Sequence, residues 1–122
     1  MYYRYIIYHT VGATMNLDEH KQWLADFYAE RLWLQLSSSR RLNFLTEEVG
    51  ELSQAIRRFE FGRDHPGERV QSVKEEKENI VEELADVLDE VFIFCEKFGI
   101  SPSELMQYSE DKLNGRFKSN AK

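Results

Sequence analysis

Cysteine is almost absent from this chain, because Cys95 is the only one among 122 residues. A single thiol cannot form an intramolecular disulfide, and this usage is typical of proteins in a reducing cytoplasm. Cys95 lies in an apolar stretch between Phe92 and Phe98, with no basic residue directly beside it. We therefore expect a cytoplasmic protein in which Cys95 is a buried, inert thiol.

Long hydrophobic runs are missing as well. Although 42% of the residues are hydrophobic, no stretch approaches the roughly 18 consecutive apolar residues that a membrane span needs. Residues 1–14 include Arg4 but no small-residue cleavage site of the kind that ends a signal peptide. The sequence therefore predicts no membrane partner.

Basic residues are outnumbered, with 16 Lys and Arg against 22 Asp and Glu and a formal net charge of −6. Binding to a nucleic-acid polymer depends largely on Lys and Arg that release counterions from phosphates. The charge balance therefore argues against a polymer of this kind as a partner. The length suffices for one compact domain with one core, but not for two.

Proline and glycine are scarce and are confined to a few breaks between segments of helical character. A first helix is expected from Asn16 or Asp18 up to the serine run 37–39, which we interpret as a connector. Three more are expected over about 42–61, 73–98 and 102–114, separated by a loop at 62–67 and by Gly99 with the capping sequence 101–104. Four amphipathic helices predict an all-α, four-helix-bundle-like fold.

Apolar residues recur at spacings of three and four within the predicted helices, which is typical of a buried stripe. Four of the six tyrosines instead lie before Met15, where they indicate a strand-like arm, a segment that packs on a partner subunit or an upstream extension. We therefore expect an N-terminal arm over 1–15, one all-α domain over 16–118 and a short tail over 119–122. The residues expected to face the core are Leu42, Leu45, Val49, Leu52, Ile56 and Phe59 in the second helix, and Ile80, Leu84, Val87, Leu88, Val91 and Phe94 in the third.

The acidic residues are concentrated in the middle of the chain. Residues 47–90 hold 14 of the 22 acidic residues but only 6 of the 16 basic ones, a balance of −8 that leaves +2 for the remainder. Two pairs at a spacing of three, Glu48 with Glu51 and Glu83 with Asp86, each project from one edge of a helix and border an apolar stripe. If these helices pack antiparallel, the four carboxylates converge.

Converging carboxylates call for a cation. Two like charges about 4 Å apart repel by about 4 kcal/mol at an effective dielectric constant of about 20. Oxygen-only ligands favour Mg²⁺, or Mn²⁺ as a substitute, over zinc or copper, and none of the three histidines lies in either pair. Mg²⁺ commonly shares its coordination with substrate phosphates, so the pattern indicates a phosphate-handling site. A solvated acidic face remains the alternative.

The ordered motifs Glu47-Glu48-Val49-Gly50-Glu51 and Glu83-Leu84-Ala85-Asp86 resemble those of the MazG-like nucleotide pyrophosphohydrolases, members of the all-α NTP pyrophosphatase superfamily. The resemblance extends over about residues 17–117. It implies Mg²⁺-dependent hydrolysis of a nucleoside triphosphate between its α and β phosphates, which gives the monophosphate and pyrophosphate. It also implies assembly as a homodimer or homotetramer.

The resemblance further implies a role for individual residues. Glu48, Glu51, Glu83 and Asp86 would ligate Mg²⁺. Glu47 would be the catalytic residue that orients the attacking water, or it would help to bind a second ion together with Asp89. Lys112 and Arg116, on the last predicted helix, would bind the phosphate chain; compensation of the helix dipole is the alternative.

Several alternatives stay open at this point. The 31 residues between Glu51 and Glu83 are many for this family, and the loop 62–67 could cover the site, hold His65 near the substrate or form a subunit interface. Trp23, Phe27 and Trp33 are expected in the core rather than stacked on a base. The competing functions are a non-catalytic helical interaction module and a pyrophosphohydrolase acting on phosphoribosyl-ATP or another nucleotide.

Overall fold

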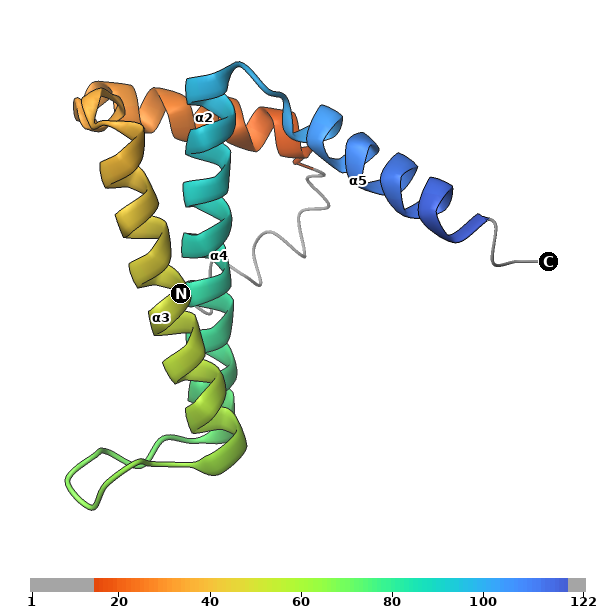
Figure 1. The fold of residues 1–122 in the computed structure, drawn as a ribbon. Coiled ribbons are helices and arrows are strands. Elements are labelled where there is room, and N and C mark those ends of the chain that lie inside the picture. The colour runs from red at the N-terminus through yellow and green to blue at the C-terminus, as the bar shows by residue number, and fades with distance from the viewer. Residues whose placement is uncertain (1–14, 119–122) are drawn as a thin grey trace. The chain divides into compact units, whose positions relative to one another are not determined.

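The computed structural model describes residues 15–118 and confirms the all-α class (Figure 1). Over this part of the chain the regular structure is helical throughout, and no helix in it is long and apolar enough to span a membrane. The predicted N-terminal arm, apart from Met15, and the predicted tail lie outside the described residues. The elements are α2 (Leu17–Glu30), the short 3₁₀ helix η1 (Trp33–Gln35), α3 (Ser38–Phe61), α4 (Val73–Phe98) and α5 (Pro102–Phe117).

The chain divides into two compact units, and α4 takes part in both. One unit spans Leu36–Val91 and holds α3 with most of α4; the other combines Met15–Gln35 with the end of α4 and α5. A single domain over 16–118 stays a prediction. Both units are described below, each by itself.

In the first unit, α3 and α4 run antiparallel and are joined by a loop over 62–72 (Figure 1). Gly62, with φ of 76°, ends α3 in a backbone conformation that favours glycine. The Ser72 hydroxyl accepts a hydrogen bond from the Glu75 backbone N–H at 3.1 Å and so caps the start of α4. The predicted bounds of both helices on either side of the loop are confirmed.

The serine run is not a connector, as we had expected, but the beginning of α3. Ser37 is the N-cap, its side chain accepting a hydrogen bond from the Arg40 backbone N–H at 3.2 Å, and Ser38 is the first helical residue. Serine is among the preferred N-cap residues because its hydroxyl satisfies a backbone donor that the helix leaves unpaired. The preceding helix therefore ends earlier than predicted, at Glu30, and Leu32 adopts a positive φ of 60°.

The second unit has its own apolar core, in which Leu24 and Ala25 of α2 and Phe92, Ile93 and Cys95 of α4 are buried. Burial raises the pKa of the Cys95 thiol, as expected for an inert core cysteine. The predicted capping box at the start of α5 is present, with Ser101 and Glu104 bonded reciprocally. The helix continues to Phe117, three residues beyond the predicted end.

The aromatic residues of α2 and η1 were expected in the core, but the structure places two of them largely at the surface. Trp23 is 57% exposed and Trp33 is 44% exposed. They flank Phe27, whose ring centroid lies 5.3 Å from that of Trp23 and 6.1 Å from that of Trp33. The Arg31 guanidinium lies over the same Phe27 ring at 3.4 Å. These aromatics form a surface cluster within the second unit.

The first unit buries less of its apolar stripes than we had predicted. On α3, the exposed residues Leu42, Val49 and Ile56 recur every seven positions, and on α4 Leu84 is 51% and Leu88 is 43% exposed. Two antiparallel helices cover one face of each other and leave the opposite side of each stripe uncovered. The predicted burial of these residues is therefore wrong within a single chain.

Candidate metal centre

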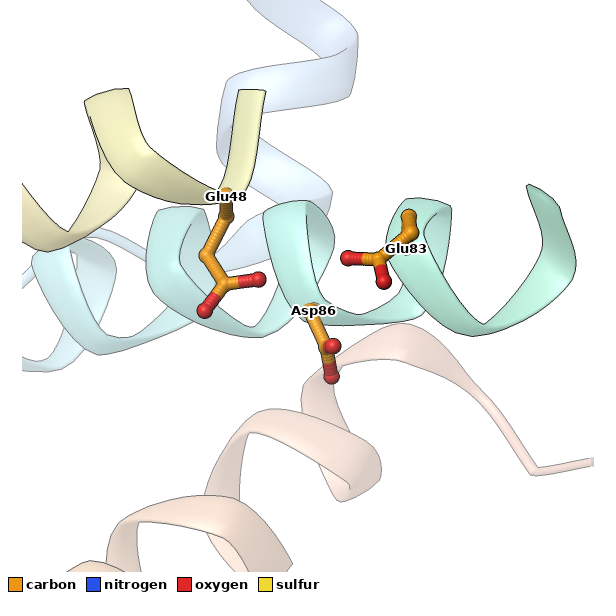
Figure 2. A group of neighbouring side chains, drawn as sticks. All are labelled: Glu48, Glu83 and Asp86. Carbon is orange, nitrogen blue, oxygen red and sulfur yellow. The ribbon is translucent and has the colours of Figure 1, made fainter. Parts of the chain in front are cut away.

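Three carboxylates from α3 and α4 meet in the first unit. Glu48, Glu83 and Asp86 each offer one oxygen, and these oxygens all lie within 4.8 Å of one another. Figure 2 shows Glu48 reaching from α3 toward Glu83 and Asp86 on α4. The spacing of three places Glu83 and Asp86 on one edge of α4, and the antiparallel packing brings Glu48 opposite them. The predicted convergence therefore holds for these three residues.

The other three predicted acidic residues lie outside this group. Glu51 is exposed, yet it is within hydrogen-bond reach of both Glu48 and Glu83. Two carboxyl groups bond in this way only when one of them holds a proton and donates it. Glu47 is exposed on the position of α3 that precedes Glu48. Asp89, one turn beyond Asp86, contributes to the negative potential at that residue.

Burial and neighbouring negative charges disfavour the ionised form of all three carboxyl groups. Burial, followed by the charges of Glu51 and Asp86, raises the pKa of Glu48 to about 7. Burial also raises the pKa of Glu83, to which the hydrogen bond and charge of Glu51 add. The pKa of Asp86 is raised by burial and by the charges of Glu82 and Asp89. Without a cation, Glu48 therefore keeps its proton at pH values where an isolated glutamate has lost it, and the pKa values of Glu83 and Asp86 are shifted in the same direction.

The donor set fits a hard divalent cation. The Oε2 atoms of Glu48 and Glu83 are buried and have no hydrogen-bond partner. Leaving such an atom unpaired costs folding free energy, because burial removes its hydrogen bonds to water and no other hydrogen bond replaces them. A cation at this point would satisfy both oxygens and offset the repulsion among the carboxylates. The acidic cluster is thus compatible with Mg²⁺ or Mn²⁺, which prefer oxygen ligands.

This electrostatic arrangement predicts a pH dependence of stability in the absence of metal. The pKa of Glu48 rises from 4.5 to about 7 on folding, so between these values the folded state binds more protons than the unfolded state. The free energy of unfolding therefore falls as the pH rises through this window. Urea unfolding in EDTA should show this decline, and saturating Mg²⁺ should counteract it by favouring the ionised carboxylates.

The variant Glu48→Gln provides the control for that profile, because glutamine does not titrate. Its metal-free stability should fall less steeply with pH than that of the wild type over the same window. An equally steep decline in both proteins would show that Glu48 is not responsible.

The remaining predicted residues lie elsewhere. Lys112 and Arg116 are exposed on α5 in the second unit, where the Lys112 ammonium lies 6.0 Å from the centre of the Tyr108 ring. Their phosphate-binding role stays a prediction. His65 is exposed in the loop between α3 and α4.

Beside the carboxylates, the first unit contains a cavity of about 420 Å³ that the sequence did not indicate. Two acidic residues of the predicted site, Glu51 and Glu83, line it. The other lining residues are Gln54, Ala55 and Arg58 from α3, Gln71 from the loop and Asn79 from α4. Isolated amide side chains have no periodic pattern, so no feature of the sequence distinguishes these from other surface amides.

An all-α chain in which two antiparallel helices present a cation-compatible carboxylate cluster defines a narrow class of protein. Residues 36–120 match the family model of the MazG nucleotide pyrophosphohydrolase domain. The chain therefore belongs to the MazG family, as its motifs had indicated. It is also similar to the "Uncharacterized protein YvdC" of Bacillus subtilis (strain 168), with 36% identity over 104 residues that cover 85% of this chain and 98% of the relative. No solved structure matches the chain.

Proposed function

We propose that this protein is a Mg²⁺-dependent nucleoside triphosphate pyrophosphohydrolase of the cytoplasm, which releases pyrophosphate and a nucleoside monophosphate. The observation that supports it best is the convergence of Glu48, Glu83 and Asp86 on one point between two helices. Membership of the MazG family favours a nucleotide as substrate. A divalent cation held by these carboxylates would allow an acidic protein to bind an acidic substrate.

In this proposal Glu48, Glu83 and Asp86 hold the ion, with Glu51 as a further ligand. When bound, Mg²⁺ or Mn²⁺ would neutralise phosphate oxygens and the charge that develops on them during hydrolysis. The carboxylates fix where the phosphates lie, since they come from two packed helices rather than from a mobile loop. Their close packing also keeps part of the cluster out of water, which strengthens its electrostatic interactions.

Glu47 is the proposed catalytic residue. It is exposed on α3 and directly precedes Glu48, one of the proposed ligands. As a general base it would take a proton from water while the water oxygen forms a bond to phosphorus. The anhydride bond between the α and β phosphates then breaks, and its electron pair leaves with the pyrophosphate. Asp89 would join Glu47 if a second ion is bound.

Lys112 and Arg116 are proposed to bind the phosphate chain. They lie four residues apart on α5 and so share one face of that helix. The Arg116 guanidinium can bind a phosphate through two parallel hydrogen bonds.

A pyrophosphate-release assay tests the function directly. The protein would be incubated with Mg²⁺ and each canonical ribo- and deoxyribonucleoside triphosphate, and with phosphoribosyl-ATP. Release of pyrophosphate that EDTA abolishes and that Mn²⁺ restores is the expected result. Exclusive hydrolysis of phosphoribosyl-ATP would favour the related pyrophosphohydrolase. Hydrolysis of none of these compounds would favour a non-catalytic interaction module.

We also propose that two or four copies assemble through the first unit. Among the described apolar residues of that unit, Ala55 is the one that is buried, while the α3 stripe of Leu42, Val49 and Ile56 is exposed. Contiguous exposed apolar surface on a helix pair is typical of an interface between subunits.

The mass in solution, measured by light scattering during size-exclusion chromatography, should therefore be that of a dimer or tetramer. Leu84→Glu should lower the mass, because it places a charge in the proposed interface. Asn43→Glu is the control, since this exposed residue lies about 100° around α3 from Leu42. A monomeric wild type would contradict the proposal.

A further inference from the structure

We propose that the amide pair Gln71 and Asn79 reads the nucleobase of the substrate. This inference rests on the proposed function and adds to it the place of the base and the residues that select it. The two amides line the 420 Å³ cavity together with Glu51 and Glu83. The cavity thus borders the candidate metal centre directly.

The cavity continues away from the carboxylates along the two helices. Asn79 precedes Glu83 by one helical turn, or about 6 Å along α4. Arg58 follows Glu51 by two turns on α3. A nucleotide whose phosphates are held at Glu48, Glu83 and Asp86 can therefore extend its sugar and base toward Asn79 and Gln71.

The charges of the cavity favour the uncharged end of a nucleotide over its phosphates. Glu51 and Glu83 are acidic, and Arg58 is the one basic residue that lines the cavity. Its guanidinium is already paired with the carboxylate of Glu68 in the loop, at 2.5 Å. Phosphates without a cation would be repelled by such walls, whereas a base carries no charge at neutral pH.

The amide pair has the chemistry that a base requires. The Asn79 amide donates a hydrogen bond to the Gln71 side-chain oxygen at 3.0 Å, which orients both groups. Each amide also holds an N–H₂ group and a carbonyl oxygen, so that the pair retains donors as well as acceptors for a ligand. A base edge presents both kinds of group, while a phosphate offers acceptors alone. The donors and acceptors of the pair therefore match those of a base better than those of a phosphate.

The loop holds Gln71 in place on both sides. Arg69 pairs with Glu75 at 2.6 Å, and Ser72 caps α4. Earlier in the loop, the Glu68 carboxylate accepts a hydrogen bond from the Asp64 backbone N–H at 2.8 Å. The long loop between the two acidic motifs thus supplies a fixed recognition residue. Groups held in this way discriminate better between ligands than groups that must be ordered on binding.

The experiment compares kcat/KM for the eight canonical nucleoside triphosphates between the wild type and the variants Asn79→Asp, Asn79→Ala and Gln71→Ala. Gln22→Ala is the matched control, because Gln22 is an exposed amide on α2 that is bonded to Asp26. The wild type should prefer one base, and the ratio between best and worst base should shrink about tenfold in the Asn79 variants. Stabilisation by Mg²⁺ should be unchanged in all of them.

Three outcomes would overturn the inference. One is a wild type without base preference, and another is a base ratio that all three cavity variants leave unchanged. The third is a change confined to the ratio of ribo- to deoxyribonucleotides, which would assign the amides to the sugar.

If no triphosphate is hydrolysed, the proposed function fails but the base pocket can still be tested. Calorimetric titration with nucleoside monophosphates in Mg²⁺ should then show binding of one base that Asn79→Asp weakens. Absence of binding, or equal binding of every base, would overturn it.

Discussion

Replacing Glu48 by glutamine is expected to abolish pyrophosphate release and at the same time to stabilise the metal-free protein. Activity should fall at least about 100-fold, since even groups that only support a metal ligand contribute about 10- to 100-fold. Stability should rise because the neutral amide removes one of the converging charges, while its shape is nearly that of the carboxyl group. We expect a gain of about 1 kcal/mol at pH 8, limited by water that screens a half-buried side chain.

The opposite signs of the two effects separate a metal ligand from a structural residue. A residue that merely supports the fold would lose activity together with stability. The variant should also lose most of its stabilisation by Mg²⁺, because binding to the folded state alone stabilises in proportion to the logarithm of ligand concentration over Kd. Pyrophosphate release and urea unfolding, with and without Mg²⁺, measure all three quantities.

Glu60→Gln is the matched control, because Glu60 is an exposed glutamate on the same helix. It should behave as the wild type does in each measurement. Wild-type activity in Glu48→Gln, or a loss of metal-free stability, would contradict the assignment of Glu48.

Much of the acidic centre follows from the sequence, and the reason is geometric. Positions three apart share a helix edge, so the pairs Glu48 with Glu51 and Glu83 with Asp86 were predicted as neighbours. Antiparallel packing across one loop then brings the two edges together. The structure departs from this picture at Glu51, which is exposed at the margin of the group formed by the other three. Its place depends on a side-chain rotamer rather than on helix periodicity.

Helix bounds were predictable where capping chemistry was unambiguous. Gly62 ends α3, and the capping box at Ser101 begins α5, as expected. The serine run was misread because consecutive serines favour both loops and helix starts, and the side-chain bond of Ser37 decides between them. The apolar stripe of α3 was correctly located, but periodicity shows only that a face is apolar and not what covers it.

The least predictable feature of the first unit is a buried ion pair. Arg41 follows another arginine and precedes Leu42, a pattern that is typical of an exposed helix surface. In the structure both Arg41 and Glu90 are buried, at 3% and 7% exposure. The Arg41 Nη1 atom lies 3.4 Å from Glu90 Oε1 and 3.5 Å from Oε2. Burial raises the pKa of Glu90, and the charge of Arg41 opposes this rise.

Replacing Arg41 by methionine is therefore expected to cost about 3–5 kcal/mol of unfolding free energy at pH 8, since it leaves the Glu90 carboxylate buried without its cation. Arg40→Met is the control, because Arg40 is the exposed neighbour on the same helix. Urea unfolding at one protein concentration provides the comparison. A loss no larger for Arg41→Met than for Arg40→Met would contradict the prediction.

Two further measurements identify the charge as the cause. The loss in Arg41→Met should be smaller near pH 5 than at pH 8, because Glu90 has a raised pKa and can bury itself as a neutral acid once its cation is gone. The double variant Arg41→Met with Glu90→Leu should recover most of the lost stability, since it removes both charges and keeps apolar volume. A double variant as unstable as Arg41→Met alone would instead assign the loss to packing.

The pair joins α3 to α4 near the carboxylates. Its removal should therefore also weaken Mg²⁺ binding, because the two helices that position Glu48 opposite Glu83 would be less firmly held.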